Sequence, residues 1–122
     1  MTSAEIETNL AYIQEQLAVQ VGIESPTCIL EKLNNLTNIL GMSAEVLAWS
    51  EKIYNEKLME VTLMKQYKDL SATDKKMVFA GILSNEILQH TKAERLNKAL
   101  THSIDGLRSM LSFLKEEVKR IG

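Results

Sequence analysis

A row of short polar and charged side chains runs along the last third of the sequence and is the best candidate for ligand-binding chemistry. Each member lies three or four positions beyond the previous one, so all of them share one side of a helix. The row consists of Thr101, Asp105, Arg108, Ser112 and Lys115. Asp105 can hold Arg108 in position, and the hydroxyl groups can donate or accept hydrogen bonds. Solvated helix faces usually carry Lys, Glu and Gln, so these shorter groups suit a half-buried polar surface.

Four basic side chains on or beside this row could hold an anion. They are Arg95, His102, Arg108 and Lys115. If the row is half-buried at a contact between subunits, these groups would surround a phosphate, whose oxygens arginine can bind with two parallel hydrogen bonds. The row therefore predicts a site for a small, nucleotide-like anion. Two alternatives stay open: the row pairs with the acidic first helix of the same or a neighbouring chain, or it is a solvated helix face.

The patterns that metal sites and covalent catalysis require are missing from the sequence. There is no Cys-x-x-Cys and no His-Glu-x-x-His, and His90 and His102 would lie about 18 Å apart on one helix. The single cysteine, Cys28, has no neighbouring histidine, and we expect an inert, buried thiol. The sequence thus predicts a protein that is not an enzyme and that uses no cofactor or metal.

Charge is distributed unevenly along the chain. Residues 1–45 carry one basic residue against six acidic ones, a net charge of −5, whereas residues 92–122 carry seven basic and four acidic residues, a net charge of +3. Opposite charges favour packing of the two ends side by side, within one chain or between copies. The whole chain has a formal net charge of −2, which argues against direct binding of nucleic acid, because such proteins usually carry a strongly basic surface.

Capping residues and apolar spacing predict the helices of the first half. Thr2 with Glu5 forms a capping box for a helix over residues 3–20, which Gly22 would end in a left-handed conformation. Ser25 followed by Pro26 begins a second helix, which Gly41 would end. Ser43 would then cap a third helix that runs to about residue 68.

The second half of the chain is predicted to be helical as well. Ser71 with Asp74 marks the start of a segment over residues 72–121, which forms either two helices hinged near residue 90 or one long rod. With five Gly and one Pro in 122 residues, the chain has few places to turn. The sequence therefore predicts a single all-α domain over residues 1–122, an antiparallel bundle of four or five helices with a long C-terminal helix.

An apolar segment over residues 77–83 indicates a contact between copies of the chain. It is apolar all the way round, which is typical of a helix that protein surrounds on every side, and its glycine would allow another backbone to approach closely. The rest of the chain does not obviously surround it, so we expect a homo-oligomer. The expected interface residues are Met77, Phe79, Gly81, Ile82 and Leu83.

The sequence predicts no targeting signal and no membrane span. No apolar run approaches the length of roughly 18–20 residues that spans a bilayer, and the first residues lack the basic start and apolar core of a signal peptide. We therefore expect a cytoplasmic protein with no membrane partner.

The segment over residues 93–117 resembles the C-terminal segment of small all-helical proteins encoded in the early regions of tailed bacteriophages. The matching positions are Arg95, Asn97, His102, Asp105, Arg108, Ser112 and Lys115. The resemblance implies a phage or prophage setting inside the host cell. Together with the polar row, it predicts a non-enzymatic binding protein that captures a host protein or a nucleotide-like anion between helices, for example as a counter-defence sponge. The alternatives are an accessory protein of phage DNA replication or recombination, and a purely structural oligomer subunit.

Overall fold

The computed structural model describes residues 1–22 and 25–121, and its described part is helical with short connections. Four α-helices follow one another, α1 (Ser3–Leu17), α2 (Pro26–Thr62), α3 (Ala72–Ile82) and α4 (Ser84–Ile121), and the short 3₁₀ turn η1 (Lys65–Tyr67) lies between α2 and α3. No strand occurs in these described residues. The prediction of an all-α chain with a long last helix is confirmed.

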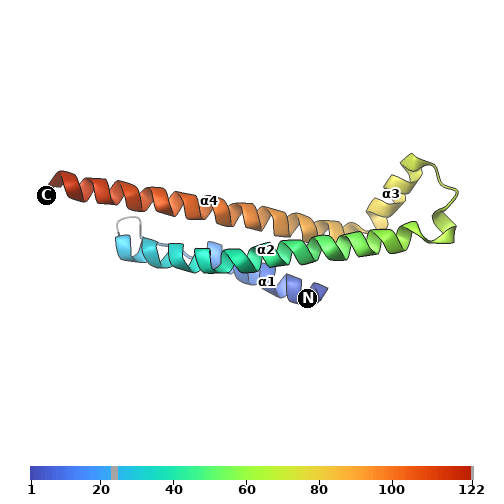
Figure 1. Ribbon diagram of the computed structural model, residues 1–122, viewed down its shortest axis with the longest axis horizontal. Coiled ribbons are helices and arrows are strands. Elements are labelled where there is room, and N and C mark those ends of the chain that lie inside the picture. The colour runs from blue at the N-terminus through green and yellow to red at the C-terminus, as the bar shows by residue number, and fades with distance from the viewer. Residues whose placement is uncertain (23–24, 122) are drawn as a thin grey trace.

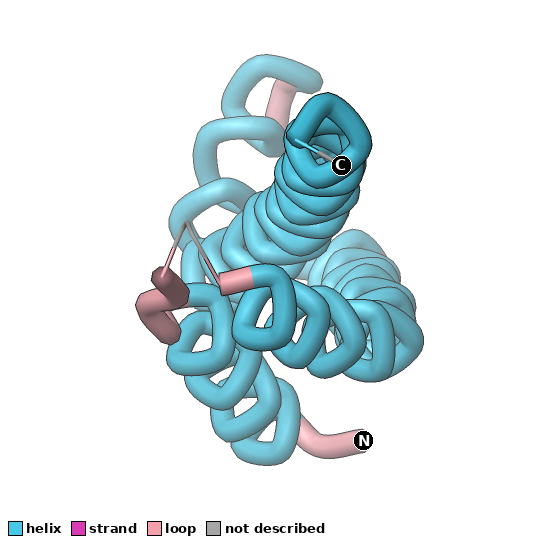
Figure 2. The backbone as a smooth tube through the Cα atoms, turned by 90° about the vertical axis from the view of Figure 1, so that its left-hand side faces the viewer, coloured by secondary structure: helices cyan, strands magenta, loops and turns pink. Residues whose placement is uncertain are grey.

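Two long antiparallel helices, α2 and α4, form the frame of the molecule (Figure 1). They contain 37 and 38 residues, so each is about 55 Å long at 1.5 Å per residue. The shorter α1 packs against the middle of this pair, and α3 lies at the end where the chain turns from α2 into α4 (Figure 1). Figure 2 looks along the long axis of the molecule and shows helices joined by short loops, with no strand in the described residues. The molecule is therefore a long helical hairpin that a third helix covers only in part.

The start of α1 is the one predicted, but its end is not. The Thr2 hydroxyl accepts a hydrogen bond from the Glu5 N–H at 3.2 Å. The helix ends at Leu17, and no described residue, Gly22 included, has a positive φ. Instead, the Lys32 ammonium of α2 donates to the carbonyl oxygens of Leu17 at 3.2 Å and Val19 at 2.7 Å. A lysine from the neighbouring helix thus satisfies the carbonyls that a glycine turn was expected to satisfy.

The predicted break between the second and third helices is wrong, because α2 runs without interruption from Pro26 to Thr62. Ser25 caps its start as predicted, with its hydroxyl accepting from the Cys28 N–H at 3.3 Å. Gly41 lies on the surface inside the helix, where it costs about 1 kcal/mol relative to alanine. Burial of Leu36 and Val46 on either side of it stabilises the helix by roughly 1.5–3 kcal/mol for each side chain. The stabilisation from these core contacts is larger than the cost of a glycine in the helix.

Of the two alternatives left open for residues 72–121, the structure has two helices, but they meet at residue 83 and not near residue 90. The chain turns at Leu83, a buried residue between α3 and α4, and α4 then continues as one helix. Ser71 does cap α3 as predicted, its hydroxyl accepting from the Asp74 N–H at 3.1 Å. Gln89 and Ala93 on α4 are buried and hold the region around residue 90 in the helix.

The buried core lies where α1 covers α2 and α4. One group of side chains joins all three helices through Ile13, Ile29, Leu36, Ile39, Leu100, Ile104 and Leu107. A second group, closer to the start of α1, contains Ile6, Leu10, Val46 and Ala93. Cys28 is exposed, so the expectation of a buried thiol is wrong. It lies in the first turn of α2 and lines a surface pocket together with residues 19–22, which follow α1.

Candidate functional site

The predicted polar row does form one side of α4, and every member of the predicted ligand site is exposed in the single chain. These residues are Arg95, Thr101, His102, Asp105, Arg108, Ser112 and Lys115. Asp105 and Arg108 approach to 4.0 Å, and the Thr101 hydroxyl donates to the Asn97 carbonyl at 3.1 Å. The row is thus accessible along one helix, and a half-buried site there would need a second copy of the chain as its other wall.

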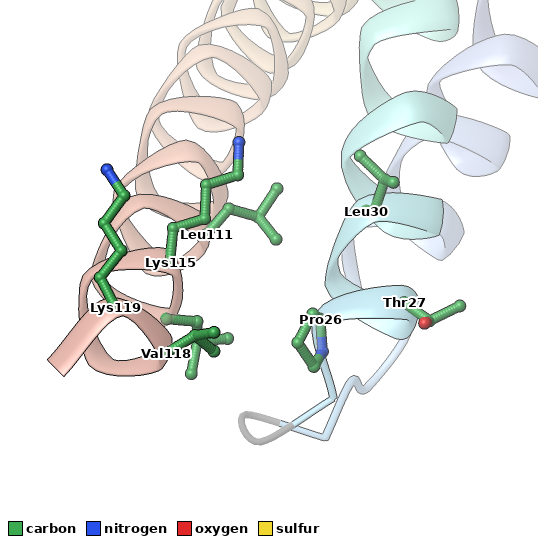
Figure 3. Close-up of a pocket in the computed structure, with 8 residues that line it drawn as sticks. Pro26, Thr27, Leu30, Leu111, Lys115, Val118 and Lys119 are labelled. Carbon is green, nitrogen blue, oxygen red and sulfur yellow. The ribbon is translucent and has the colours of Figure 1, made fainter. Parts of the chain in front are cut away.

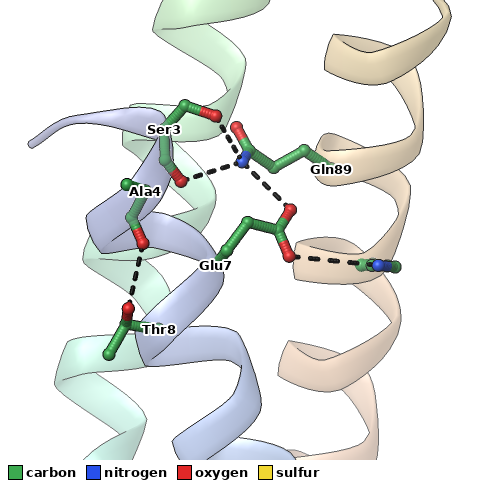
Figure 4. Close-up of polar contacts among 6 residues, drawn as sticks. Ser3, Ala4, Glu7, Thr8 and Gln89 are labelled. Atoms are coloured by element: carbon green, nitrogen blue, oxygen red, sulfur yellow. Dashed lines mark hydrogen bonds and ion pairs between the residues drawn. The ribbon is translucent and has the colours of Figure 1, made fainter.

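The acidic helix α1 pairs with a different part of α4. The Glu7 carboxylate lies 3.9 Å from the Lys92 ammonium and accepts a hydrogen bond from Gln89 at 3.1 Å (Figure 4). Neither Lys92 nor Gln89 belongs to the row. The alternative in which α1 of the same chain faces the row is therefore not what the structure shows.

Gln89 is the centre of a polar contact that sequence reasoning missed. Its side-chain amide is buried and donates to the Ser3 carbonyl oxygen at 3.2 Å, the Ser3 hydroxyl at 3.0 Å and the Glu7 carboxylate at 3.1 Å (Figure 4). The signal in the sequence is a glutamine at an apolar position, four residues before Ala93 and seven before Leu96. Because a buried amide needs partners, the contact fixes the register between α1 and α4.

A second buried polar contact joins the two long helices. The Asn97 amide of α4 donates to the Ser43 hydroxyl of α2 at 3.1 Å, and the Ser43 side chain is buried. This explains why Ser43, predicted as a helix cap, lies inside a helix. Both polar contacts set the alignment of helices, so we assign them a structural role.

An apolar groove opens between the start of α2 and the end of α4, and sequence reasoning did not find it. Its volume is about 570 Å³, and its lining residues are Pro26, Thr27, Leu30, Leu111, Leu114, Lys115, Val118 and Lys119. In Figure 3, Leu111 and Val118 point from α4 toward Leu30 and Pro26 of α2. Lys115 belongs both to the predicted row and to this groove.

The apolar segment around α3 lies at the opposite end of the molecule from this groove (Figure 1). No residue of α3 is buried, so the prediction that protein surrounds this helix does not hold within one chain. Of the predicted interface residues, Met77, Gly81 and Ile82 are exposed, and Leu83 is buried by its own chain. Phe79 is half-buried and packs edge-to-face on Tyr67, with ring centres 5.8 Å apart.

Exposed apolar side chains from the neighbouring helices lie at the same end. Met59 comes from the last turn of α2, Leu63 is the residue that follows this helix, and Leu88 comes from the start of α4. We call Met59, Leu63, Met77, Ile82 and Leu88 the α3-end surface.

No protein-family model, curated protein or solved structure matches this chain. Among the residues that the structure describes, no group of three or more His, Cys, Asp or Glu side chains could hold a metal ion. None of the described helices is long and apolar enough to cross a membrane.

Proposed function

We propose that this chain is a non-enzymatic helical binding protein that works as a homo-oligomer, whose copies associate through the α3-end surface. The observation that carries the proposal is Met77, which is 70% exposed on a helix that has no buried residue of its own. Monomeric proteins seldom expose large apolar patches, and those that occur usually mark a contact with another molecule.

The charges around this surface suit a contact between identical copies. Residues 56–76 contain five lysines and four acidic residues, so this part of the chain is nearly neutral overall. Two copies that meet here bring positive lysines and negative carboxylates together. The two surfaces therefore do not repel each other, as two surfaces of the same charge would. An apolar centre with a mixed charged rim is typical of protein interfaces.

The binding role that we propose belongs to the polar row on α4. The row lies away from the α3-end surface, since Lys115 is about 40 Å along α4 from Leu88. A second contact between copies, along α4, would supply the wall that the single chain lacks, and a nucleotide-like anion would be held there by Arg108, His102 and Lys115. The arrangement that supports this is the approach of Asp105 to Arg108, because a carboxylate one turn away holds the guanidinium in a fixed place. The resemblance of residues 93–117 to phage early-region proteins implies a phage setting, and a counter-defence sponge that removes a nucleotide signal is the form that the proposed role takes there.

A purely structural oligomer subunit is the second candidate, because the α3-end surface supports it equally well. Native mass spectrometry of the protein purified from a nucleotide-rich lysate distinguishes the two, since it measures the number of subunits and any retained small molecule together. We expect an oligomer that carries an anion, and we expect Arg108→Ala and His102→Ala to lose the anion but keep the subunit number. An oligomer that carries no anion in wild type would support the structural subunit instead.

A further inference from the structure

The apolar stripe of α4 continues beyond the core into the groove. Leu100, Ile104 and Leu107 are buried, and the next residues at the same spacing are Leu111, Leu114 and Val118. The stripe becomes progressively exposed toward its end, where Val118 is 68% exposed. The continuous spacing shows that the residues of the groove belong to the same helix face that forms the core.

The side chains that line the groove are exposed because α1 does not reach this end of the α2–α4 pair (Figure 1). Leu30, which faces this stripe from the first turns of α2, is 47% exposed, whereas Ile29 beside it is buried in the core. The helix α1 covers the middle of the α2–α4 pair and does not extend along the end of α4 (Figure 1). In the middle of the hairpin, α1 packs on a surface formed by α2 and α4 (Figure 1). The groove is a surface of the same kind, formed by the start of α2 and the end of α4.

The charges that line the groove are all positive. Its eight lining residues include Lys115 and Lys119 and no carboxylate. Lys119 lies 3.9 Å from Glu116, but both side chains are largely exposed, so this pair contributes little and leaves the ammonium group able to meet another anion. An occupant that matches the groove must be apolar on one side and acidic at its edges.

We propose that the groove binds an amphipathic helix of a partner protein, with apolar residues in the groove and Asp or Glu beside Lys115 and Lys119. Helices recognise grooves of this kind through apolar residues one and two turns apart. The chain's own acidic helix is not the occupant, because Ile6, Leu10 and Ile13 already bury its apolar face. The inference goes beyond the anion-binding role proposed above and is independent of it and of self-association; the two proposals share only Lys115.

Fluorescence anisotropy with two labelled peptides tests the proposal. Both peptides have about 18 residues with leucines on one helix face, about five turns in all, and they differ only in flanking glutamates or lysines. We expect the glutamate peptide to bind wild-type protein at least about tenfold more tightly than the lysine peptide, because only its charges complement the groove. Lys115→Glu should weaken binding of the glutamate peptide by about tenfold or more, and Lys98→Glu, an exposed lysine of α4 outside the groove, should change it less than about twofold.

A second variant tests the apolar part of the groove. Val118→Glu should abolish binding of the glutamate peptide, because it places a negative charge in the apolar groove. Since Val118 is exposed, the helix content measured by circular dichroism should equal that of wild type. Equal binding of the two peptides, binding that survives both Lys115→Glu and Val118→Glu, or failure of the glutamate peptide to bind would each overturn the inference. Binding of decanoate without binding of the glutamate peptide would assign the groove to small anionic amphiphiles and would overturn it too.

The molar mass of the same samples separates this inference from the proposed self-association. A wild-type protein that is monomeric and binds the glutamate peptide contradicts the oligomer alone. An oligomeric protein that retains an anion but does not bind the peptide contradicts the groove proposal alone.

Discussion

The middle and the two ends of the α2–α4 pair use the same two helices but bury them very differently. In the middle, Leu36 and Leu100 are completely buried. Toward one end Leu30 and Val118 are exposed, and toward the other Met59 and Leu88 are exposed. On α4 the apolar spacing continues from Leu100 to Val118, so the exposure of Val118 reflects what covers that end of the helix. Leu30, Met59 and Leu88 lie on other faces of their helices, and Ile29 and Val61, on the core face of α2, are buried at its two ends.

The length of α1 sets the extent of the covered region. Its 15 residues span about 22 Å, whereas α2 and α4 each span about 55 Å. The helix α1 can therefore cover less than half of the hairpin. The ends that α1 does not cover are the surfaces to which we assign partners, a second copy at the α3 end and an acidic helix at the groove.

The largest expected difference between the regions is in the cost of removing a leucine side chain. Leu100→Ala should lower the free energy of unfolding by about 2–5 kcal/mol, because it leaves a cavity between three helices. Leu30→Ala should cost under about 1 kcal/mol, because the side chain is already partly in water. Urea unfolding followed by circular dichroism measures both values. Equal losses for the two variants would contradict the distinction between a covered middle and an open end.

A smaller effect is expected from the polar contact that aligns α1 with α4. Gln89→Ala should lower the free energy of unfolding by about 1–3 kcal/mol, because it removes the donor to Ser3 and Glu7 and leaves a gap at a buried position. Hydrogen exchange should become faster in the first turns of α1 before it changes elsewhere. Gln66→Ala, in the exposed η1 turn, serves as the control and should have no effect. Unchanged exchange in α1 would show that the contact does not hold this helix.

The sequence predicts where helices begin much better than where they end. Thr2, Ser25 and Ser71 cap helices as expected, because an N-cap is a local contact between one side chain and a backbone N–H three residues later. The ends depend on distant partners. The Lys32 ammonium donates to the Leu17 carbonyl oxygen at the end of α1, and the Asn97 amide donates to the Ser43 hydroxyl at the position where a break was predicted.

The candidate site, too, has one part that follows from local sequence and one part that depends on contacts between distant residues. The side of α4 that carries the row follows from helical spacing alone, and the structure places Thr101, Asp105 and Arg108 along one exposed face. The groove could not be predicted in this way, because it depends on how the start of α2 lies relative to Leu111 and Val118 of α4. That alignment is fixed by buried contacts between residues far apart in the sequence.

The smallest expected effect on stability comes from the polar row itself. Arg108→Ala should change the free energy of unfolding by less than about 0.5 kcal/mol, because its pair with Asp105 is long and solvated. The same variant is expected to lose the bound anion, so a loss of ligand at unchanged stability would identify a site and not a packing contact. A destabilisation above about 1 kcal/mol would mean that Arg108 holds the fold instead.

The most direct test of the account is the molar mass of the protein in solution, measured by light scattering after size exclusion at several concentrations. We expect wild-type protein at a multiple of the 13.8 kDa chain mass, and Met77→Glu at the mass of a single chain, because a charge at an exposed apolar contact opposes association. Val118→Glu, at the other end of the molecule, should keep the wild-type mass. A wild-type protein with the mass of one chain at every concentration, or a Met77→Glu variant with the wild-type mass, would contradict the account.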